Sequence, residues 1–327
     1  MLRLHPYRYH RPTSVAEAVR LLAEHEGDAM LIAGGTDLVP NMKHRLFTPG
    51  HLISLLGIED LRRLEEDERG FRFGACVSLD RIARDAGVRR ALPSLAHACE
   101  LISGPQLRRM GTIGGNVCLD TRCTYYNQTF FWRKALGYCL KKDGDVCHVV
   151  KGGTRCVAAH SADAATALIP LEAELTIAGP TGERVVPIAR FFTSDGIWNR
   201  RMEPGEVLTE VRVPRPGPRT RHVYRKLRAR RSIDFPLLNL AVRVDLGPDD
   251  TVADLRLVAS GMGSYPRQLG KVGEAAIGRH LSEAVIDRIA EQAFRQCHPL
   301  ANIPVDAEWR RAMLPVLARR ALSEIEA

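Results

Sequence analysis

The chain has 327 residues, a formal net charge of +9 and an ordinary share of hydrophobic and charged residues. That length exceeds what one typical core uses, so two or three domains are expected. No apolar run approaches the ~18 to 20 residues of a membrane span, and residues 1–14 lack a signal-peptide core, so a cytoplasmic protein without a membrane partner is expected. In that reducing compartment, eight cysteines are more often thiols or metal ligands than disulfides.

The first predicted elements are a helix and a strand that ends in a glycine pair. Ser14 and Glu17 match a capping box, and the helix that follows is expected to stop at Gly27. Residues 29–33 form a short apolar strand that runs directly into Gly34 and Gly35. Paired glycines after a strand let the backbone approach a ligand, and free amide groups there can hold a phosphate. A plain tight turn is the alternative.

A second glycine pair, Gly114 and Gly115, lies about eighty residues further on, between Thr112 and Asn116. The two turns could close on the two ends of one pyrophosphate, which backbone amides and hydroxyls would then hold. Neither turn matches GxGxxG or GxxxxGK[ST], so neither a Rossmann domain nor a P-loop is indicated.

Four cysteines follow the second glycine pair within a short aromatic stretch. They are Cys123, Cys139, Cys147 and Cys156. Four thiolates fit an iron-sulfur cluster or a structural zinc ion, although their spacing matches neither a zinc ribbon nor a ferredoxin; disulfides or scattered core thiols are the alternatives. Phe130, Phe131 and Trp132 are expected to pack a hydrophobic shell around them.

The last third of the chain opens with a basic segment, residues 215–231. Such a segment could attract an acidic protein, a phosphate-bearing ligand or nucleic acid, but no nucleic-acid module accompanies it, so nucleic acid is not expected as a partner. A solvated basic face is the alternative. Residues 237–246 and 251–260 are predicted to form paired strands, 281–296 a helix, and 309–317 a second helix with Pro315 at an end or a kink.

The chain offers no convincing catalytic group. It has no nucleophile with a neighbouring base and no HExxH motif, and its eleven histidines are dispersed. Each histidine is interpreted as a surface or capping residue. No catalytic residue is therefore predicted.

The two glycine segments resemble the FAD-binding signatures of the flavin subunits of the molybdenum hydroxylase family, which includes xanthine dehydrogenase and carbon monoxide dehydrogenase. The segments are residues 31–38 and 112–116. The resemblance implies FAD as cofactor and an α+β fold, with a two-lobed FAD-binding domain followed by a C-terminal α/β domain. The expected boundaries are 1–56 for the small lobe, 57–215 for the larger lobe and 216–327 for the C-terminal domain.

The same resemblance implies which residues contact the flavin. Asp163 takes the place of an aspartate that normally follows the second signature, Leu208 packs on the ring, and Lys226 lies near it, although the basic segment leaves open which cation faces the flavin. The implied flavin-binding residues are Leu31, Ile32, Ala33, Gly34, Gly35, Thr36, Asp37, Leu38, Ser103, Thr112, Ile113, Gly114, Gly115, Asn116, Asp163, Leu208 and Lys226.

Residues 118–160 resemble an insertion found in one branch of that family, the flavin subunits of the 4-hydroxybenzoyl-CoA reductases, which hold an additional [4Fe-4S] cluster. The resemblance implies that the four cysteines bind such a cluster. It further implies a molybdenum-cofactor subunit and a [2Fe-2S] subunit as partners, ferredoxin as electron donor, and a dimer of heterotrimers. The activity would be reductive dehydroxylation to benzoyl-CoA.

Three alternatives to that interpretation stay open. The cysteines of the same flavin subunit could hold zinc, which is colourless where an iron-sulfur cluster absorbs broadly. The flavin subunit could serve a molybdenum hydroxylase with a different substrate. The chain could also be a non-enzymatic, metal-stabilised module whose basic segment binds nucleic acid.

Overall fold

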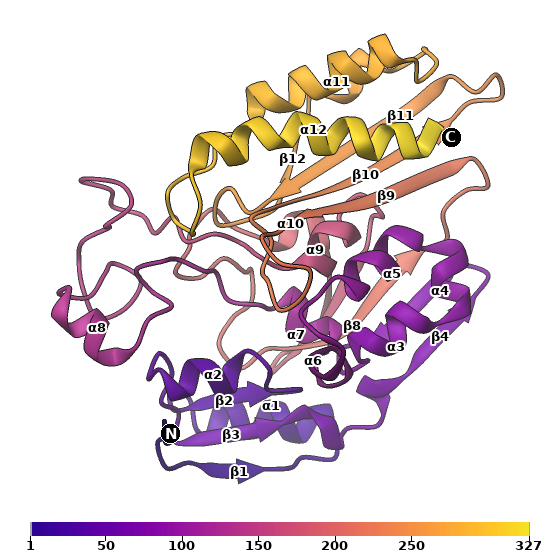
Figure 1. Ribbon diagram of the computed structural model, residues 1–327. Helices are drawn as coiled ribbons and strands as arrows, with labels where there is room; N and C mark the ends of the chain where they lie inside the picture. The colour runs from indigo at the N-terminus through magenta and orange to yellow at the C-terminus, as the bar shows by residue number, and fades with distance from the viewer. Residues whose placement is uncertain (1, 327) are drawn as a thin grey trace.

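Three sheets organise the computed structural model, which describes residues 2–326 (Figure 1). The small lobe holds a parallel sheet in the order β1-β3-β2, with two helices. Its elements are β1 (Arg8–His10), α1 (Val15–Glu24), β2 (Ala29–Ile32), α2 (Leu38–Lys43) and β3 (His51–Ser54). The predicted helix and strand are confirmed. Ser14 accepts a hydrogen bond from the Glu17 amide at 3.2 Å, while the Glu17 carboxylate accepts one from the Thr13 amide at 2.9 Å.

The middle of the molecule is built on a five-stranded antiparallel sheet in the order β4-β5-β8-β6-β7. Its strands are β4 (Leu64–Asp67), β5 (Gly70–Gly74), β6 (Glu174–Gly179), β7 (Gly182–Pro187) and β8 (Val207–Pro214). The short helices around it are α3 (Leu79–Arg84), α4 (Ala86–Ala91), α5 (Pro93–Glu100), α6 (Pro105–Met110), α7 (Ile113–Val117), α9 (Asp163–Leu168) and α10 (Ile188–Phe191). Because β8 lies between β5 and β6, the sheet joins segments from both sides of the cysteine-rich stretch.

The C-terminal sheet is antiparallel, in the order β12-β11-β10-β9, and is covered by two long helices (Figure 1). Its elements are β9 (Thr220–Leu227), β10 (Leu238–Leu246), β11 (Val252–Ser260), β12 (Arg267–Gln268), α11 (Glu283–Gln296) and α12 (Ala307–Glu326). The predicted strand pair is confirmed, with Leu246 opposite Val252. The other face of this sheet meets α5 and α9, which joins it to the middle of the molecule.

The last helix differs from the prediction. α12 continues through Pro315 to Glu326, whereas the sequence predicted a helix that reached only residue 317. Proline removes one backbone donor from a helix. Burial offsets that loss, because Leu314, Leu317 and Leu322 lie on both sides of the proline and are almost completely buried against the C-terminal sheet.

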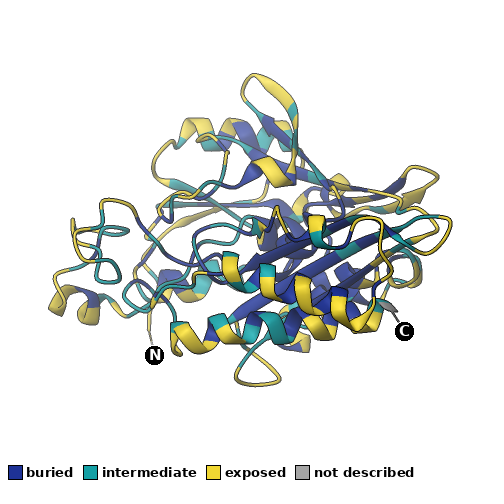
Figure 2. Ribbon diagram, turned by 90° about the horizontal axis from the view of Figure 1, so that it is seen from above, coloured by how far each residue is buried: buried dark blue, intermediate teal, exposed yellow. Residues whose placement is uncertain are grey.

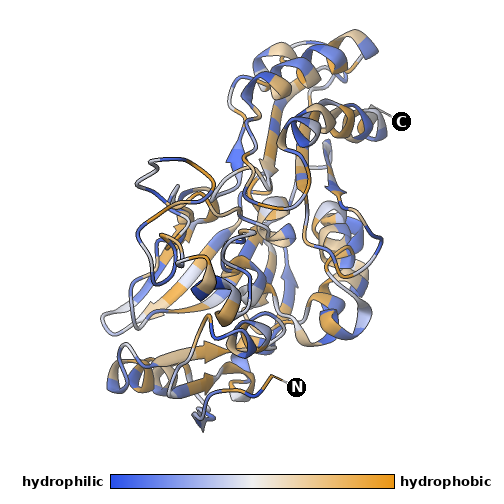
Figure 3. Cartoon of the chain, turned by 60° about the vertical axis from the view of Figure 1, so that its left-hand side comes forward, coloured by the Kyte–Doolittle hydropathy of each residue, from blue (hydrophilic) through white to orange (hydrophobic). Residues whose placement is uncertain are grey.

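The strands carry the cores, as their hydropathy shows (Figure 3). The middle sheet and its helices bury one large cluster that includes Phe71, Phe73 and Phe191, and a second cluster lies between the C-terminal sheet and α11 and α12. The helices mix hydrophilic and hydrophobic residues along their length. Among residues 2–326, no helix is both long and apolar enough to cross a membrane.

The cysteine-rich segment leaves the middle domain at Arg122 and returns at Ala159. These two residues form an antiparallel bridge, with amide-to-carbonyl distances of 2.8 and 2.6 Å. Residues 123–158 between them project beside the small lobe and contain a single α-helix, α8 (Phe130–Ala135) (Figure 1). Most of this segment is half-buried or exposed (Figure 2). We call residues 123–158 the cysteine loop.

Two buried cations dock the cysteine loop onto the rest of the chain. The Arg133 side chain is 1% exposed and donates to the carbonyl oxygens of Arg45 at 2.9 Å and His44 at 3.3 Å. The Lys141 ammonium lies 2.8 Å from an Asp120 carboxylate oxygen and 2.7 Å from the Thr121 hydroxyl. Polar contacts rather than an apolar core therefore position this loop.

The predicted hydrophobic shell is wrong for two of its three members, whereas Phe130 is half-buried. Phe131 is 77% exposed and Trp132 is 40% exposed. The buried cluster beside the cysteines is instead made by Leu46, Tyr126 and Cys139. A loop of this size cannot enclose its own aromatic residues, so it borrows apolar surface from the small lobe.

A buried histidine next to this loop gives a pH-dependent prediction. His160 is 1% exposed, and burial lowers its pKa to about 3. The unfolded chain therefore binds the proton more tightly, and stability is lost as pH falls from about 6.5 towards 3. We expect His160 to contribute roughly 3 kcal/mol of the stability lost between pH 7 and pH 4, from ~1.4 kcal/mol per pKa unit.

Urea unfolding of the His160→Gln variant at several pH values measures this contribution. The loss of stability between pH 7 and pH 4 should be smaller than in the wild-type chain. The exposed His298, replaced in the same way, should leave the pH dependence unchanged. Equal pH dependence in all three proteins would refute the assignment to His160.

Candidate functional site

The two glycine turns meet in space, although about eighty residues separate them in the sequence. A Cβ atom on Gly34 would lie 1.8 Å from the Met110 carbonyl oxygen, and one on Gly111 would lie 3.5 Å from the Thr36 hydroxyl. Only glycine at position 34 lets the two backbones touch. The structure therefore brings the segment 31–38 against residues 110 and 111, which lead into the second glycine turn.

The first turn offers unused donors. The amides of Gly34, Gly35 and Thr36 donate no hydrogen bond within residues 2–326. Gly35 has a φ of +68°, in the left-handed region that favours glycine. Successive free amides around such a residue form a concave anion-binding surface. This turn is equipped to hold a phosphate.

The second turn differs, because its amides are already used inside the chain. Ile113 donates to the Val77 carbonyl at 3.0 Å, Gly114 to the Ala75 carbonyl at 2.9 Å, and Gly115 to the Thr112 hydroxyl at 3.1 Å. A Cβ atom on Gly114 would lie 2.7 Å from that of Ala75. The second turn is thus a closely packed wall rather than a second set of free donors.

Asn116 links the second turn to the segment that follows the cysteine loop. Its side-chain oxygen accepts a hydrogen bond from the Ala164 amide at 2.9 Å, at the start of α9. This bond holds Ser161 and Asp163 beside the turn. The Ser161 hydroxyl is buried and has no partner within residues 2–326. A buried hydroxyl without a partner is unfavourable, so this group fits a site that a polar ligand completes.

Asp163 and Lys226 form a buried ion pair. The Lys226 ammonium lies 2.9 Å from an Asp163 carboxylate oxygen, and the two side chains are 0% and 4% exposed. Tyr224 donates a short hydrogen bond to the other carboxylate oxygen, and Asn239 donates to the Tyr224 hydroxyl at 3.0 Å. Burial raises the pKa of Asp163, and the lysine and the tyrosine oppose that rise.

The remaining implied flavin contacts are Ser103 and Leu208. Lys226 also donates to the Leu101 carbonyl at 3.2 Å, and Ser103, two residues further on, has a φ of +49°. Leu208 is 4% exposed and belongs to the core of the middle domain. Ser103 and Leu208 thus belong to the middle domain. The Lys226 side chain reaches it from β9 and is completely buried there.

Ion pairs occupy much of the basic segment. Arg219 pairs with Asp250 at 2.9 Å, Arg225 with Glu324, and Arg230 with Asp234. With Lys226 bound to Asp163, fewer cations remain to attract a polyanion than the sequence suggested. Among residues 225–231, Lys226 pairs with Asp163, and Arg228 donates at 3.3 Å to the Leu101 carbonyl that Lys226 also contacts.

A half-buried arginine, Arg122, ties the base of the cysteine loop to the first glycine turn. Arg122 forms an ion pair with Asp37 and stacks over the Phe235 ring at 4.2 Å. Burial lowers the pKa of Arg122 to about 10. The sequence analysis missed this pair because 85 positions separate its members. It also missed Tyr224, although its position two residues before Lys226 on a strand places both on one face.

The four cysteine thiols of the loop influence one another electrostatically. Cys139 and Cys156 are 8% and 6% exposed, while Cys123 and Cys147 are half-buried. Burial raises the pKa of Cys123 to about 11, and the neighbouring Cys156 and Cys139 raise it further. Cys139 and Cys147 raise the pKa of Cys156 in the same way. Each thiol therefore lies within electrostatic reach of at least one other.

Backbone amides point at three of these sulfurs. Val150 donates to the Cys147 sulfur at 3.5 Å. The amides of Tyr125 and Tyr126 lie near the Cys123 sulfur and that of Ala158 near the Cys156 sulfur, where they lower the pKa of these thiols. Such bonds stabilise a thiolate and tune metal-sulfur centres. They are of little use to a neutral core thiol. This donor set fits a metal-sulfur centre.

The spacing of the sulfurs bears on which metal they suit. Within residues 2–326, no three cysteine sulfurs lie within 4.8 Å of one another. A single tetrahedral zinc ion with ~2.3 Å bonds draws its sulfurs to about 3.8 Å apart. The cysteine side chains would therefore have to move before one zinc ion could bind three of these sulfurs.

Two regions of the chain match known domain families. Residues 5–216 match the FAD binding domain in molybdopterin dehydrogenase, and residues 222–325 match the CO dehydrogenase flavoprotein C-terminal domain. Both descriptions are of flavoproteins, which favours a flavoprotein over a nucleic-acid-binding module.

Characterised relatives cover almost the whole chain. The carbon monoxide dehydrogenase medium chain of Hydrogenophaga pseudoflava is 30% identical over 97% of this chain and 96% of its own length. The aldehyde oxidoreductase FAD-binding subunit of Escherichia coli K12 is 32% identical over 90% of this chain and 92% of its own length.

Solved structures share the fold. A chain of carbon monoxide dehydrogenase from Hydrogenophaga pseudoflava superposes with a TM-score of 0.81 and 28% identity, covering 98% of this chain and 97% of its own. A chain of quinoline 2-oxidoreductase from Pseudomonas putida has a TM-score of 0.81 at 20% identity, which shows a common fold.

Proposed function

This chain belongs to the FAD-binding subunits of the molybdenum hydroxylase family, and on that premise we propose that it is the FAD and [4Fe-4S] electron-transfer subunit of a 4-hydroxybenzoyl-CoA reductase. Membership makes it a flavoprotein subunit of an oxidoreductase. The observation that supports the finer assignment is the cysteine loop, whose four thiols influence one another electrostatically and have backbone amides near three of their sulfurs.

The residues that would hold FAD are those of the two glycine turns and the segment after the cysteine loop. The free amides of Gly34, Gly35 and Thr36 would bind the pyrophosphate, and the unpartnered Ser161 hydroxyl would meet a polar atom of the cofactor. Lys226 and Tyr224 would hold the Asp163 carboxylate in place. When bound, a flavin exchanges electrons singly or in pairs.

Cys123, Cys139, Cys147 and Cys156 would bind the cluster, which supplies one-electron transfer. Arg122, through its ion pair with Asp37, joins the base of the loop to the first glycine turn. Docking of Arg133 on the small lobe holds the other side of the loop. The chain's own contribution is therefore to keep a sulfur site and a flavin site at fixed positions relative to each other.

The proposed partners are a molybdenum-cofactor subunit, a [2Fe-2S] subunit and a reduced ferredoxin as electron donor, in a dimer of heterotrimers that acts in anaerobic aromatic degradation. Names of relatives support a multi-subunit enzyme, since they are a medium chain and an FAD-binding subunit. The net charge of +9 suits an acidic donor such as a ferredoxin. Electrons would pass through this chain towards the partners, and the ring hydroxyl of 4-hydroxybenzoyl-CoA would be removed reductively.

Cofactor content tests the proposal. We expect the chain purified without oxygen to contain about one FAD, four irons and four acid-labile sulfides. FAD without iron would leave a flavin subunit whose cysteines hold zinc or nothing. A chain that binds neither would contradict the FAD site described above.

Replacing Cys139 with serine is expected to remove the iron and abolish ferredoxin-driven turnover, while about one FAD per chain remains. Cys139 is buried in a cluster with Leu46 and Tyr126, which includes no residue of the two glycine turns. Iron, sulfide and FAD are measured on the same samples. Cys297→Ser is the matched control, because Cys297 is a buried thiol of the C-terminal core. The Cys297→Ser protein should keep all its iron. Unchanged turnover in Cys139→Ser would refute the role of the cluster in accepting electrons.

A second candidate is the flavin subunit of another molybdenum hydroxylase, with zinc or no metal at the cysteines. Two relatives favour this candidate. They are a carbon monoxide dehydrogenase chain and an aldehyde oxidoreductase subunit, at 30% and 32% identity. Assays of the assembled enzyme with 4-hydroxybenzoyl-CoA, carbon monoxide and aldehydes distinguish the two candidates.

A further inference from the structure

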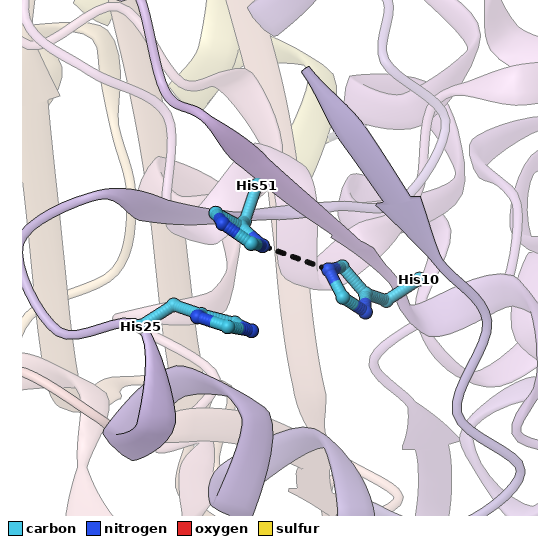
Figure 4. Close-up of side chains that lie close together, drawn as sticks. All are labelled: His10, His25 and His51. Atoms are coloured by element: carbon cyan, nitrogen blue, oxygen red, sulfur yellow. Dashed lines mark hydrogen bonds between the residues drawn. The ribbon is translucent and has the colours of Figure 1, made fainter.

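Three histidines from separate elements converge in the small lobe (Figure 4). His10 ends β1, His25 follows the last residue of α1, and His51 begins β3. One nitrogen from each ring lies within 4.8 Å of the other two, and His10 Nε2 is 2.9 Å from His51 Nδ1. We call these three residues the histidine triad.

The triad is separate from the flavin site. His51 pairs with Ala29 at the start of β2, whereas the Gly34–Gly35 turn follows the end of that strand. At about 3.3 Å per residue, the length of β2 puts roughly 10 Å between the two ends. His10 is level with Leu31, but β3 lies between β1 and β2, and strand spacings of ~4.8 Å keep His10 roughly 10 Å from β2. The proposed flavin and cluster sites use none of the three histidines.

A shared ligand is the simplest use for such a set. Imidazole nitrogen is a good ligand for Zn²⁺, Cu²⁺ and Ni²⁺, and three histidines with one open position form a common zinc site. Tetrahedral zinc with ~2.0 to 2.1 Å bonds places its nitrogens about 3.3 Å apart. The His10–His51 spacing of 2.9 Å is near that value, and the His25 nitrogen lies within 4.8 Å of both. All three rings are half-buried, so an ion can reach them from solvent.

Nearby charges are mixed. Asp28 acts electrostatically on His51 and is fixed by accepting a hydrogen bond from the Gly50 amide at 2.7 Å. Glu24 lies 3.9 Å from His25 Nε2. Arg8 is a nearby cation whose charge acts on His51 in the opposite direction to that of Asp28. Two carboxylates beside three neutral ligands offset the charge of a divalent ion.

One ring must turn for the site to form. His25 and His51 are stacked, with ring centres 3.6 Å apart and an interplanar angle of 20°, and the in-plane lone pairs of stacked rings do not converge on one point. The His25 ring makes no hydrogen bond within residues 2–326, so it can rotate about its own side-chain torsions. His10 and His51 are held on the strands, where they provide the fixed half of the site.

We propose that His10, His25 and His51 bind one divalent transition-metal ion of the zinc type, with water at the fourth position. The ion joins β1, α1 and β3 at the edge of the small lobe that lies away from the glycine turn. Its role is structural, because it fixes the sheet and the helix from which the flavin-binding turn extends.

Zinc binding by the full chain tests the proposal. The probe is Zn²⁺ alone, with bound metal counted after equilibrium dialysis. The wild-type chain should bind one zinc more than the His51→Gln variant, and its melting temperature should rise with Zn²⁺ while that of the variant does not. Loss of one ligand should weaken binding at this site at least about 100-fold. His280→Gln, which changes an exposed histidine, should behave as wild type.

Two further variants keep the result interpretable. His25→Gln changes a ring outside the sheet and should also lose one zinc, even if His51→Gln folds poorly. Cys147→Ser should retain the histidine-dependent zinc, which separates the triad from zinc bound by thiols. Equal zinc content in the wild type and in a folded His25→Gln variant would overturn the proposal, whatever the cysteine loop holds.

Discussion

Replacing Lys226 with methionine is expected to lower the free energy of unfolding by about 3–5 kcal/mol. The Lys226 ammonium is completely buried, 2.9 Å from Asp163. Its removal leaves a buried carboxylate without a cation, held by the Tyr224 hydroxyl with Asn239 beside it. Urea or thermal unfolding measures the change. FAD per folded chain is measured on the same samples. This measurement separates the effect of losing the ion pair on stability from the effect of losing the flavin contact that the family resemblance implies.

Two variants control this experiment. Arg230→Met removes an exposed cation that pairs with Asp234, and it should change stability by less than about 1 kcal/mol. Combining Lys226→Met with Asp163→Asn removes both charges and should recover part of the loss. If Lys226→Met proves as stable as Arg230→Met, the ion pair does not stabilise the fold.

Replacing Gly34 with alanine is expected to weaken FAD binding about 10- to 100-fold and to destabilise the chain by about 1–3 kcal/mol. The added methyl group would lie 1.8 Å from the Met110 carbonyl oxygen, so the two turns must separate. The separation moves the free amides of the first turn away from the wall that the second turn forms. The ratio of FAD to protein after gel filtration, and FAD titration of the apoprotein, measure the effect.

The matched control is Gly270→Ala. A Cβ atom there meets no heavy atom within 4 Å, so FAD content and stability should both stay at wild-type values. Full FAD occupancy in Gly34→Ala would show that the contact between the turns is dispensable.

Local patterns predicted the elements well. The capping box at Ser14, the apolar run into Gly34 and the strand pair around residues 247–250 are all present, because each depends on neighbouring residues. The length of α12 was underestimated, because the packing of Leu314 and Leu322 outweighs the local effect of Pro315.

The site was predicted less completely, because its contacts join distant segments. The meeting of the two glycine turns was expected, but the internal use of the Gly114 and Gly115 amides depends on their contacts with other residues, such as Ala75, that no motif describes. The ion pair of Arg122 with Asp37 has no signal in the sequence. The triad was missed for the same reason, since His10, His25 and His51 are unremarkable one by one and meaningful only in the folded lobe.

The bridge between Arg122 and Ala159 has a consequence for how this chain can vary. Its two residues face each other at the ordinary separation of paired strands, so the backbone before and after the cysteine loop is already joined by hydrogen bonds. A tight turn could span that gap without moving Asn116 or Asp163. The sulfur-bearing segment is therefore a module mounted on a complete flavoprotein framework, which can be gained, lost or exchanged while the framework stays the same.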